Sequence, residues 1–170
     1  PLLRPLKKQT AVLSIDVNPK PGLNGRYYLL MLNSDSTASL LDTTARERWT
    51  TANLGSPVIQ AQFAADGQHI FTTHADSTFW LWKPESNLHQ RIGKYTGTPY
   101  GASLSPDGTL IAAGGSDHRV HTWSVIEQRE KVVFPEFDTD VKEVIFLPDS
   151  RQFVVRTAKG EVSLWHVDQP

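Results

Sequence analysis

The strongest constraint on the fold is an internal repeat. The stretch Asp76-Ser-Thr-Phe-Trp-Leu-Trp82 returns as Asp117-His-Arg-Val-His-Thr-Trp123 and, more loosely, as Lys159-Gly-Glu-Val-Ser-Leu-Trp165. The residues at the end of the repeat are separated by 41, 41 and 42 positions, and they are Leu41, Trp82, Trp123 and Trp165. Repeats of this length bury their apolar faces by stacking on one another. The sequence therefore predicts one domain over 1–170, built of four units at about 10–47, 56–93, 98–135 and 139–168.

Each unit shows the pattern of short strands joined by tight turns. Turn pairs recur with nearly the same period, at Asn24-Gly25, Asp66-Gly67, Asp107-Gly108 and Asp149-Ser150. Such pairs suit hairpins because Gly, Asn and Asp tolerate a positive φ. The second unit predicts strands at Val58–Phe63, Ile70–Thr73 and Thr78–Trp82, with a weaker fourth at Leu88–Ile92. No segment has a long apolar period of 3.6, so we expect an all-β chain with little or no helix.

The two outer units are less regular. In the first, the residues 18–25 make a long connection after the strand Val12–Val17. The last unit supplies three predicted strands, Val141–Leu147, Gln152–Arg156 and Val162–Trp165, and the sequence stops before a fourth. We therefore expect one strand to be missing from the last unit.

Composition excludes several classes of protein. With 39% hydrophobic and 21% charged residues, the chain fits a globular protein and not a disordered one. A net charge of −1 provides no strong field for nucleic acid or anionic membranes. The absence of cysteine rules out disulfides and Cys-ligated zinc, and no apolar run approaches the ~20 residues of a membrane helix. We expect a soluble protein without nucleic-acid or membrane partners, with the cytoplasm as default location; a first residue of Pro indicates a processed product or an excerpt.

The period, the four short strands and the spacing of Asp and Trp together resemble the WD-repeat β-propeller family. The run most similar to the family is Ser105-Pro-Asp-Gly108, followed by the segment 111–117 and Thr122-Trp123. The resemblance covers roughly residues 10–168. It implies propeller blades of four antiparallel strands in four repeats, with the first and last repeats degenerate.

The resemblance also implies a structural role for particular residues. In the family, a hydrogen-bonded set joins a Ser/Thr, an Asp, a Trp and a His from a Gly-His pair, and Thr72, Asp76 and Trp82 match the first three. The corresponding structural residues of the other units are Asp35, Asp117, Trp123 and Trp165. No Gly-His pair precedes any unit, and Met31, Ala113, Lys159 and Leu41 replace family residues. We therefore expect incomplete hydrogen-bond sets outside the second unit.

Four units are too few for the ring of about seven blades that the resemblance implies. Either further blades lie outside this chain, or two copies form a homodimer with an eight-bladed ring. In the second case the N-terminal segment 1–9, near Leu2–Leu6, would complete the last blade of the other copy. A four-bladed monomer closed by its own N-terminus is the third arrangement.

No motif indicates catalysis, a cofactor or a metal. A phosphate-binding loop, a nucleophile elbow and a zinc-protease motif are all absent. His118 and His121 would point to opposite faces of a strand and so could not share an ion. One alternative comes from Leu40-Leu-Asp-Thr-Thr-Ala-Arg-Glu-Arg-Trp49, which resembles a shortened quinoprotein signature with Ala45 in place of Gly. It leaves a quinoprotein-type subunit or a propeller enzyme as the alternative to a non-enzymatic protein.

The favoured function is a scaffold or sensing module that presents rigid loops to a protein or peptide. The candidate contact residues are Trp80, His74, Tyr100, His118, Arg119 and Lys159. Aromatic, basic and histidine side chains of this kind are enriched in interaction sites. For Trp80 we favour packing between blades on the same face as Trp82, and for His74 a plain solvated turn residue.

Overall fold

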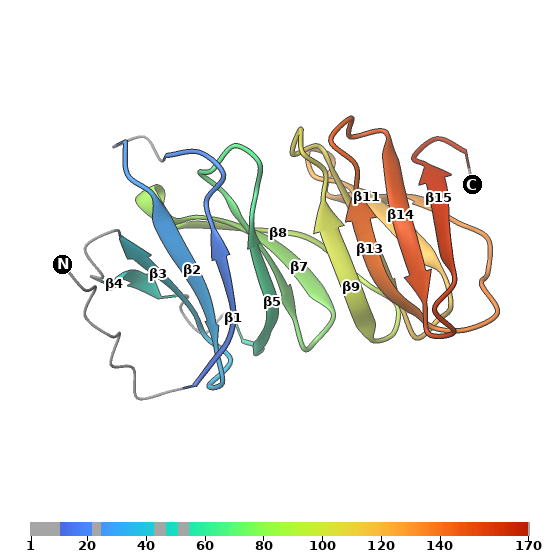
Figure 1. Ribbon diagram of the computed structural model, residues 1–170, viewed down its shortest axis with the longest axis horizontal. Helices are drawn as coiled ribbons and strands as arrows, with labels where there is room; N and C mark the ends of the chain where they lie inside the picture. Colours follow the sequence, from blue (N-terminus) through green and yellow to red (C-terminus); the bar gives the residue numbers. More distant parts are fainter. Residues whose placement is uncertain (1–10, 22–24, 43–46, 51–54, 170) are drawn as a thin grey trace.

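The computed structural model describes residues 11–21, 25–42, 47–50 and 55–169, with only the backbone described at 47–49. It contains four antiparallel sheets, which we call blades 1 to 4 (Figure 1). Blade 1 comprises β1 (Val12–Val17), β2 (Tyr28–Asn33), β3 (Ala38–Asp42) and β4 (Glu47–Thr50). Blade 2 comprises β5 (Val58–Phe63), β6 (Ile70–His74), β7 (Thr78–Lys83) and β8 (Leu88–Lys94). Blade 3 comprises β9 (Pro99–Leu104), β10 (Leu110–Gly115), β11 (Val120–Ser124) and β12 (Arg129–Val133). Blade 4 comprises β13 (Val141–Phe146), β14 (Gln152–Thr157) and β15 (Val162–His166).

The predicted all-β propeller architecture is confirmed. In every blade each strand pairs with the next one in sequence, and the four blades stand side by side in sequence order (Figure 1). The described residues contain a single helical turn, the 3₁₀ segment η1 (Pro84–Ser86), which begins at a proline. Within the part of the chain that is described, no helix has the length and apolar character needed to cross a membrane.

The turns between the second and third strands share one conformation. Their third residue has a positive φ of 65° at Ser36, 69° at Ser77, 62° at His118 and 84° at Gly160. In three of these turns an aspartate accepts a hydrogen bond from the backbone N–H two residues later, as Asp76 Oδ1 does from Thr78 at 3.1 Å. This side-chain contact is the one that makes Asp common in tight turns. The repeat in sequence is therefore a repeat of turn geometry.

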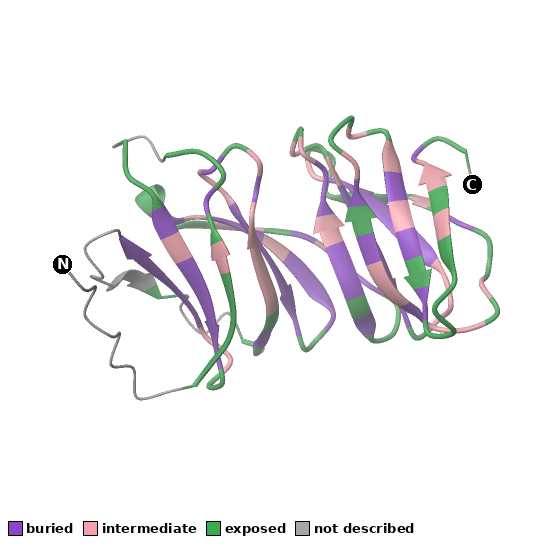
Figure 2. Cartoon of the chain, in the orientation of Figure 1, coloured by how far each residue is buried: buried purple, intermediate pink, exposed green. Residues whose placement is uncertain are grey.

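The apolar core lies between blades and not within any one of them. Trp82 on β7 packs against Tyr28, Leu30 and Leu40 of blade 1. Trp123 on β11 meets Phe79 of blade 2 edge-on, with ring centroids 4.9 Å apart. In the same way Trp165 on β15 meets Phe134, which follows β12, at 5.8 Å. The third strands of blades 2, 3 and 4 thus direct their tryptophans toward the preceding blade, and Figure 2 shows the buried residues along the facing strands.

Blades 3 and 4 approach each other through glycine. A Cβ atom on Gly101 in β9 would lie 2.7 Å from the Cα of Glu143 in β13, which is closer than real Cβ contacts allow. Gly114 in β10 similarly leaves room for the side chain of Val141. These two glycines let the backbones of neighbouring blades come together.

Among the described residues, blade 4 has three strands, whereas each of the other three blades has four. The missing fourth strand was expected from the sequence. Strand β15 pairs with β14 on one side, and apolar side chains on it are exposed, including Val162 at 66% and Leu164 at 58%. The end of the stack therefore exposes apolar side chains, and Figure 2 shows exposed positions along β15.

Candidate functional site

The turn before β7 contains a hydrogen-bonded chain that ends on Trp80. Asp76 Oδ1 accepts from the hydroxyl of Thr78 at 2.6 Å, and Thr78 Oγ1 accepts from Nε1 of Trp80 at 2.9 Å. Burial raises the pKa of Asp76, but the hydrogen bonds from Thr78 outweigh it and hold that pKa below its usual value. Trp80 is half-buried.

The prediction that Trp82 joins Asp76 and Thr72 in one hydrogen-bonded set is therefore wrong. Trp82 Nε1 has no hydrogen-bond partner among the described residues, and its ring stacks on His89 at 5.6 Å with the planes 6° apart. Trp80, two positions earlier, lies nearer the turn, and its Nε1 donates the hydrogen bond to the Thr78 hydroxyl. The role of Trp82 is packing against blade 1.

His74 is buried at the end of β6, so its prediction as a solvated turn residue is wrong. Its Nδ1 lies 2.9 Å from the carbonyl oxygen of Ser56, and its Nε2 lies 3.1 Å from Oγ1 of Thr72. Because a carbonyl can only accept, Nδ1 carries the proton and Nε2 accepts from the threonine hydroxyl. Ser56 also accepts the N–H of Asp76 through its hydroxyl at 2.9 Å. His74 thus ties the segment before blade 2 to that blade.

Blade 3 has its own polar set around Asp117. The hydroxyl of Tyr95, in the segment before the blade, donates to Asp117 Oδ1. His121 lies between two carboxylates, with Nε2 at 2.8 Å from Asp117 Oδ2 and Nδ1 at 2.5 Å from Glu130 Oε1. Burial raises the pKa of Tyr95, and the hydrogen bond to Asp117 adds to this, so Tyr95 stays a neutral donor.

Sequence reasoning missed Tyr95. It occupies the segment before blade 3, where the family places the His of the Gly-His pair, and it supplies the donor that the missing His would have supplied. In the sequence, the available indication was that Tyr95 directly follows Gly93-Lys94, in the segment where the family has its Gly-His pair. In blade 4, Trp165 Nε1 donates to Ser163 Oγ at 2.7 Å within the same strand. In blade 1, Asp35 accepts from the Thr37 hydroxyl at 2.7 Å.

The two candidate histidines of blade 3 lie in different surroundings. His118 is in the turn and not on a strand, so the strand-based argument for separating it from His121 was wrong in its premise. His118 Nε2 lies 3.2 Å from Asp140 Oδ1, whereas His121 contacts other carboxylates. Across the described residues, no group of three or more His, Cys, Asp or Glu side chains could hold a metal ion.

Two other candidate residues, Tyr100 and His118, are connected through one carboxylate and one lysine. Lys142 Nζ lies 2.8 Å from Asp140 Oδ2 and 3.5 Å from the centroid of the Tyr100 ring. The hydrogen bond from Lys142 is the main cause that lowers the pKa of Asp140, and His118 adds to it. This chain joins the turn of blade 3 to the first strands of blades 3 and 4.

Arg119 and Lys159 stand on the same face of the blades, in the turns of blades 3 and 4. Arg119 pairs with Glu136 at 3.1 Å, and Lys159 lies 3.7 Å from Asp138. Their side chains are 41% and 57% exposed, which leaves them accessible. We call the four residues Tyr100, His118, Arg119 and Lys159 the turn-side patch.

An open groove of about 420 Å³ begins beside the turn-side patch. It runs along the first strands of blades 2, 3 and 4, and its lining includes Gln60, Tyr100, Ser103, Lys142 and Arg156. The charges on its wall are paired, since Arg156 bonds Glu143 at 2.8 Å and Lys142 bonds Asp140. A polar lining with balanced charge suits a protein segment better than a small ion.

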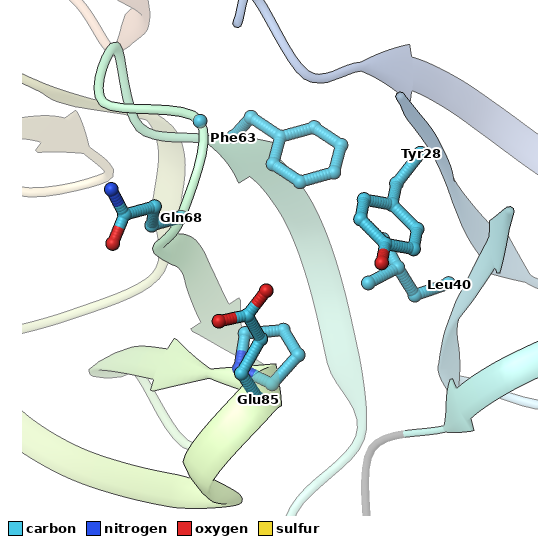
Figure 3. A pocket seen from close by; sticks show the side chains of 7 residues that line it. Tyr28, Leu40, Phe63, Gln68 and Glu85 are labelled. Carbon is cyan, nitrogen blue, oxygen red and sulfur yellow. The ribbon is translucent and has the colours of Figure 1, made fainter. Parts of the chain in front are cut away.

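A second hollow lies between blades 1 and 2 (Figure 3). Tyr28, Leu40 and Phe63 form its apolar wall, and Gln68 and Glu85 lie at its polar side. Its free volume of about 10 Å³ holds one water molecule at most. It is a packing gap and not a ligand site.

Most of the quinoprotein-like segment and the N-terminal segment 1–9 lie outside the described residues. The proposed roles of these segments therefore stay predictions.

Comparison with known proteins places this geometry among repeat proteins. The family model described as "WD domain, G-beta repeat" matches residues 89–124. A Phaeosphaeria nodorum protein named eukaryotic translation initiation factor 3 subunit I is 34% identical over 104 residues, which cover 59% of this chain and 30% of that protein. The Protein LST8 homolog of Drosophila melanogaster is 28% identical over 110 residues, covering 64% of this chain and 35% of the relative.

Another relative and one solved structure extend the comparison. The periodic tryptophan protein 2 homolog of Neurospora crassa is 26% identical over 90 residues, which cover 52% of this chain and 10% of that protein. The chain thus spans about a third or less of the length of these relatives. The crystal structure of the computationally designed Ika4 protein superposes with a TM-score of 0.73 at 14% identity, covering 95% of this chain and 94% of that one.

Proposed function

Because the chain belongs to the WD-repeat family, we propose that it is a non-enzymatic scaffold that binds a protein or peptide partner. One relative is named as a subunit of a translation initiation factor, that is, as a part of a larger assembly. The stacked blades supply the rigidity that such a role needs. Rigid presentation lowers the conformational entropy lost on binding and so favours affinity.

The observation that carries the proposal is the accessible turn-side patch on a rigid base. Tyr100, His118 and Arg119 are held by ion pairs or ring contacts, yet each remains partly exposed. Tyr100 lies on strand β9, and the turn that bears His118 and Arg119 is fixed by hydrogen bonds to the segments between blades, such as Phe137 N–H to His118 O at 2.7 Å. Pre-organised aromatic and Arg side chains are the residues that dominate binding energy at protein interfaces.

The test is direct binding with a partner recovered by affinity capture and then purified. The charge-reversed double variant Arg119→Glu, Lys159→Glu should bind at least about tenfold more weakly, since exposed charge contacts each contribute up to about 1 kcal/mol. The matched control is the double variant Arg129→Glu, Arg151→Glu, which reverses two exposed charges at the start of β12 and just before β14, at the opposite end of blades 3 and 4. Equal loss in both variants would show that net charge, and not the patch, governs binding.

We also propose that the four blades are part of a larger ring. Two sources can complete it, a second copy that gives an eight-bladed homodimer or further blades of a longer chain. Apolar exposure at both ends of the stack supports completion, with Ile15 at 67% on β1 and Leu164 at 58% on β15. Stacked blades need a neighbour on each face to bury such surface.

A further inference from the structure

A hollow of about 280 Å³ opens between blades 2 and 3, at the end of the blades opposite the turn-side patch. Its lining comes from the turns β5–β6 and β9–β10, from β7 and β8, and from the residue after β11. Both blades that form it are complete four-stranded sheets. Pockets for drug-sized ligands hold roughly 300–1,000 Å³, so this smaller space suits one long side chain. We call it the inter-blade pocket.

The floor of the inter-blade pocket is apolar. Leu81 of β7 and Leu104 of β9 are buried in the core between the two blades, and Val125 packs against the same core. None of the residues that line the pocket is a lysine or an arginine. Lysine and arginine side chains lay their methylene stems along apolar surface and keep the charged head in a polar place. The floor therefore suits the stem of a basic side chain.

The Asp107 carboxylate supplies a place for the charged head. Its Oδ1 accepts from the hydroxyls of Ser105 and Thr109 at 2.6 and 2.8 Å, and from the Thr109 N–H at 3.0 Å. These hydrogen bonds all end on Oδ1, and no Lys or Arg among the described residues pairs with Asp107, so Oδ2 is available to a ligand. Burial raises the pKa of Asp107, but the hydrogen bonds outweigh it and keep the group charged at neutral pH.

A second carboxylate in the lining, that of Asp66, is bonded within the chain. Its Oδ2 lies 2.5 Å from Nδ1 of His69, and its Oδ1 accepts the N–H groups of Gln68 and His69 at 2.8 and 3.0 Å. Two carboxylates and one imidazole leave the pocket negative even when His69 is protonated. The charge of the lining is therefore complementary to a cation.

Hydrogen bonds hold the loops around the pocket in place. Val125 donates its N–H to the carbonyl oxygen of Thr109 at 2.9 Å, and Gly108 donates to Ser105 at 2.8 Å. On the other side, the Ala64 N–H bonds the carbonyl oxygen of His69 at 2.8 Å. A pocket whose walls are already ordered loses little conformational entropy when a ligand enters.

Exposed apolar side chains lie beside the pocket on both blades. Ile126 follows Val125 and is 79% exposed. On β8, Leu88 is 59% exposed and shares a face of the strand with Gln90, which lines the pocket. A free polyamine would leave both of these residues uncovered, whereas apolar residues next to the basic one in a peptide would cover them. The surroundings of the pocket therefore favour a protein as the source of the cation.

We propose that the inter-blade pocket is a second binding site, which takes an arginine or lysine side chain of a protein partner with apolar residues beside it. The stem of that side chain lies on Leu81 and Leu104, and its cation pairs with Asp107 Oδ2. The site goes beyond the scaffold role of the turn-side patch. Because the two lie at opposite ends of the blades, one chain can hold two partners at once.

The test titrates the 170-residue chain into fluorescent capped pentapeptides and follows their anisotropy. One peptide carries an arginine between leucines, a second has lysine in its place, and a third has citrulline, which nearly keeps the shape of arginine without its charge. The arginine or the lysine peptide should bind at least about fivefold more tightly than the citrulline peptide. Spermidine, added as a competitor, tests the free polyamine.

Three variants place the binding in the pocket. Asp107→Asn should weaken it about three- to fivefold, the range of a partly exposed ion pair. Gln90→Lys puts a tethered cation into the pocket and should weaken binding at least about tenfold, whereas Gln90→Glu should tighten it about threefold. These opposite changes at one half-buried position are independent of any effect of Asp107 on folding.

Asp149→Asn is the matched control. Asp149 occupies the corresponding turn of blade 4 and accepts the N–H groups of Arg151 and Gln152 at 2.9 and 3.1 Å, but it does not line the pocket. Its replacement should leave the affinity unchanged. Equal binding of the citrulline peptide, equal losses in the two aspartate variants, or equal affinities of the two Gln90 variants would overturn the proposal. Spermidine that competes at the peptide's own affinity would overturn the assignment to a protein partner.

Discussion

Replacing Tyr95 with phenylalanine removes one oxygen from the junction between blades 2 and 3. Tyr95 is 1% exposed, and its hydroxyl donates to the Asp117 carboxylate from the segment before blade 3. The phenyl ring would keep its edge-on contact with His121, whose ring centroid lies 5.0 Å away. The change therefore removes the contacts of the hydroxyl, with Asp117 and with the Arg119 carbonyl oxygen at 3.0 Å, and leaves the packing of the ring in place.

The expected loss follows from the charge of the acceptor. A hydrogen bond to an ionised group contributes about 1.5–3 kcal/mol, more than a neutral one. For a chain of this size each kcal/mol shifts the melting temperature by about 2–4 °C, so Tyr95→Phe should melt about 3–12 °C lower. Urea unfolding at fixed protein concentration should give the same loss with an unchanged slope.

Tyr100→Phe is the matched control. Tyr100 is 45% exposed, so its change should stay within about 0.5 kcal/mol. A double-mutant cycle with Asp117→Asn should show a coupling of at least about 0.5 kcal/mol. If Tyr95→Phe costs no more than Tyr100→Phe, the Tyr95–Asp117 bond does not stabilise the junction and the reasoning fails.

Gly101→Ala should lower the free energy of unfolding by about 1–3 kcal/mol, because the new Cβ would lie 2.7 Å from a backbone atom of blade 4; an unchanged urea midpoint would contradict the close approach. Burial raises the pKa of Asp107, but hydrogen bonds from Ser105 and Thr109 outweigh that effect, so the pKa lies below its ordinary value of 3.8. Its stabilising contribution is therefore present above that ordinary value and is lost as pH falls through the lower folded-state pKa, so Asp107→Asn should melt with a shallower acid-side decline than wild type. Identical pH profiles would refute this. Trp82→Ala should cost about 3–5 kcal/mol and Trp80→Ala clearly less, since only the first is fully buried; calorimetry giving the opposite order would show that the turn network outweighs packing.

The sequence predicted the strands well because local pattern determines them. The runs Val58–Phe63 and Val12–Val17 form strands with the predicted bounds, and the remaining predicted strands differ from the observed ones by one or two residues at their ends. Alternation of side chains and Asp-containing turns are properties of adjacent residues. They can be read from a single chain without knowledge of its neighbours.

Side-chain partners were harder to predict because they depend on contacts between blades. The sequence offers two tryptophans on β7, and only the structure shows that Trp80 takes the hydrogen bond while Trp82 fills the space beside blade 1. Tyr95 was missed since its acceptor, Asp117, lies 22 residues later. The link from His118 to Tyr100 likewise runs through Asp140 and Lys142, which no motif marked.

The tryptophans all point the same way along the stack of blades, so the stack has a direction, as a polymer of asymmetric subunits has. Trp82, Trp123 and Trp165 all face the preceding blade, so the two ends of the stack are chemically different. Units with unlike ends either return to their starting point after a whole number of steps or continue without limit as a filament. The rotation from one blade to the next therefore decides whether such units form a finite ring or an open-ended filament.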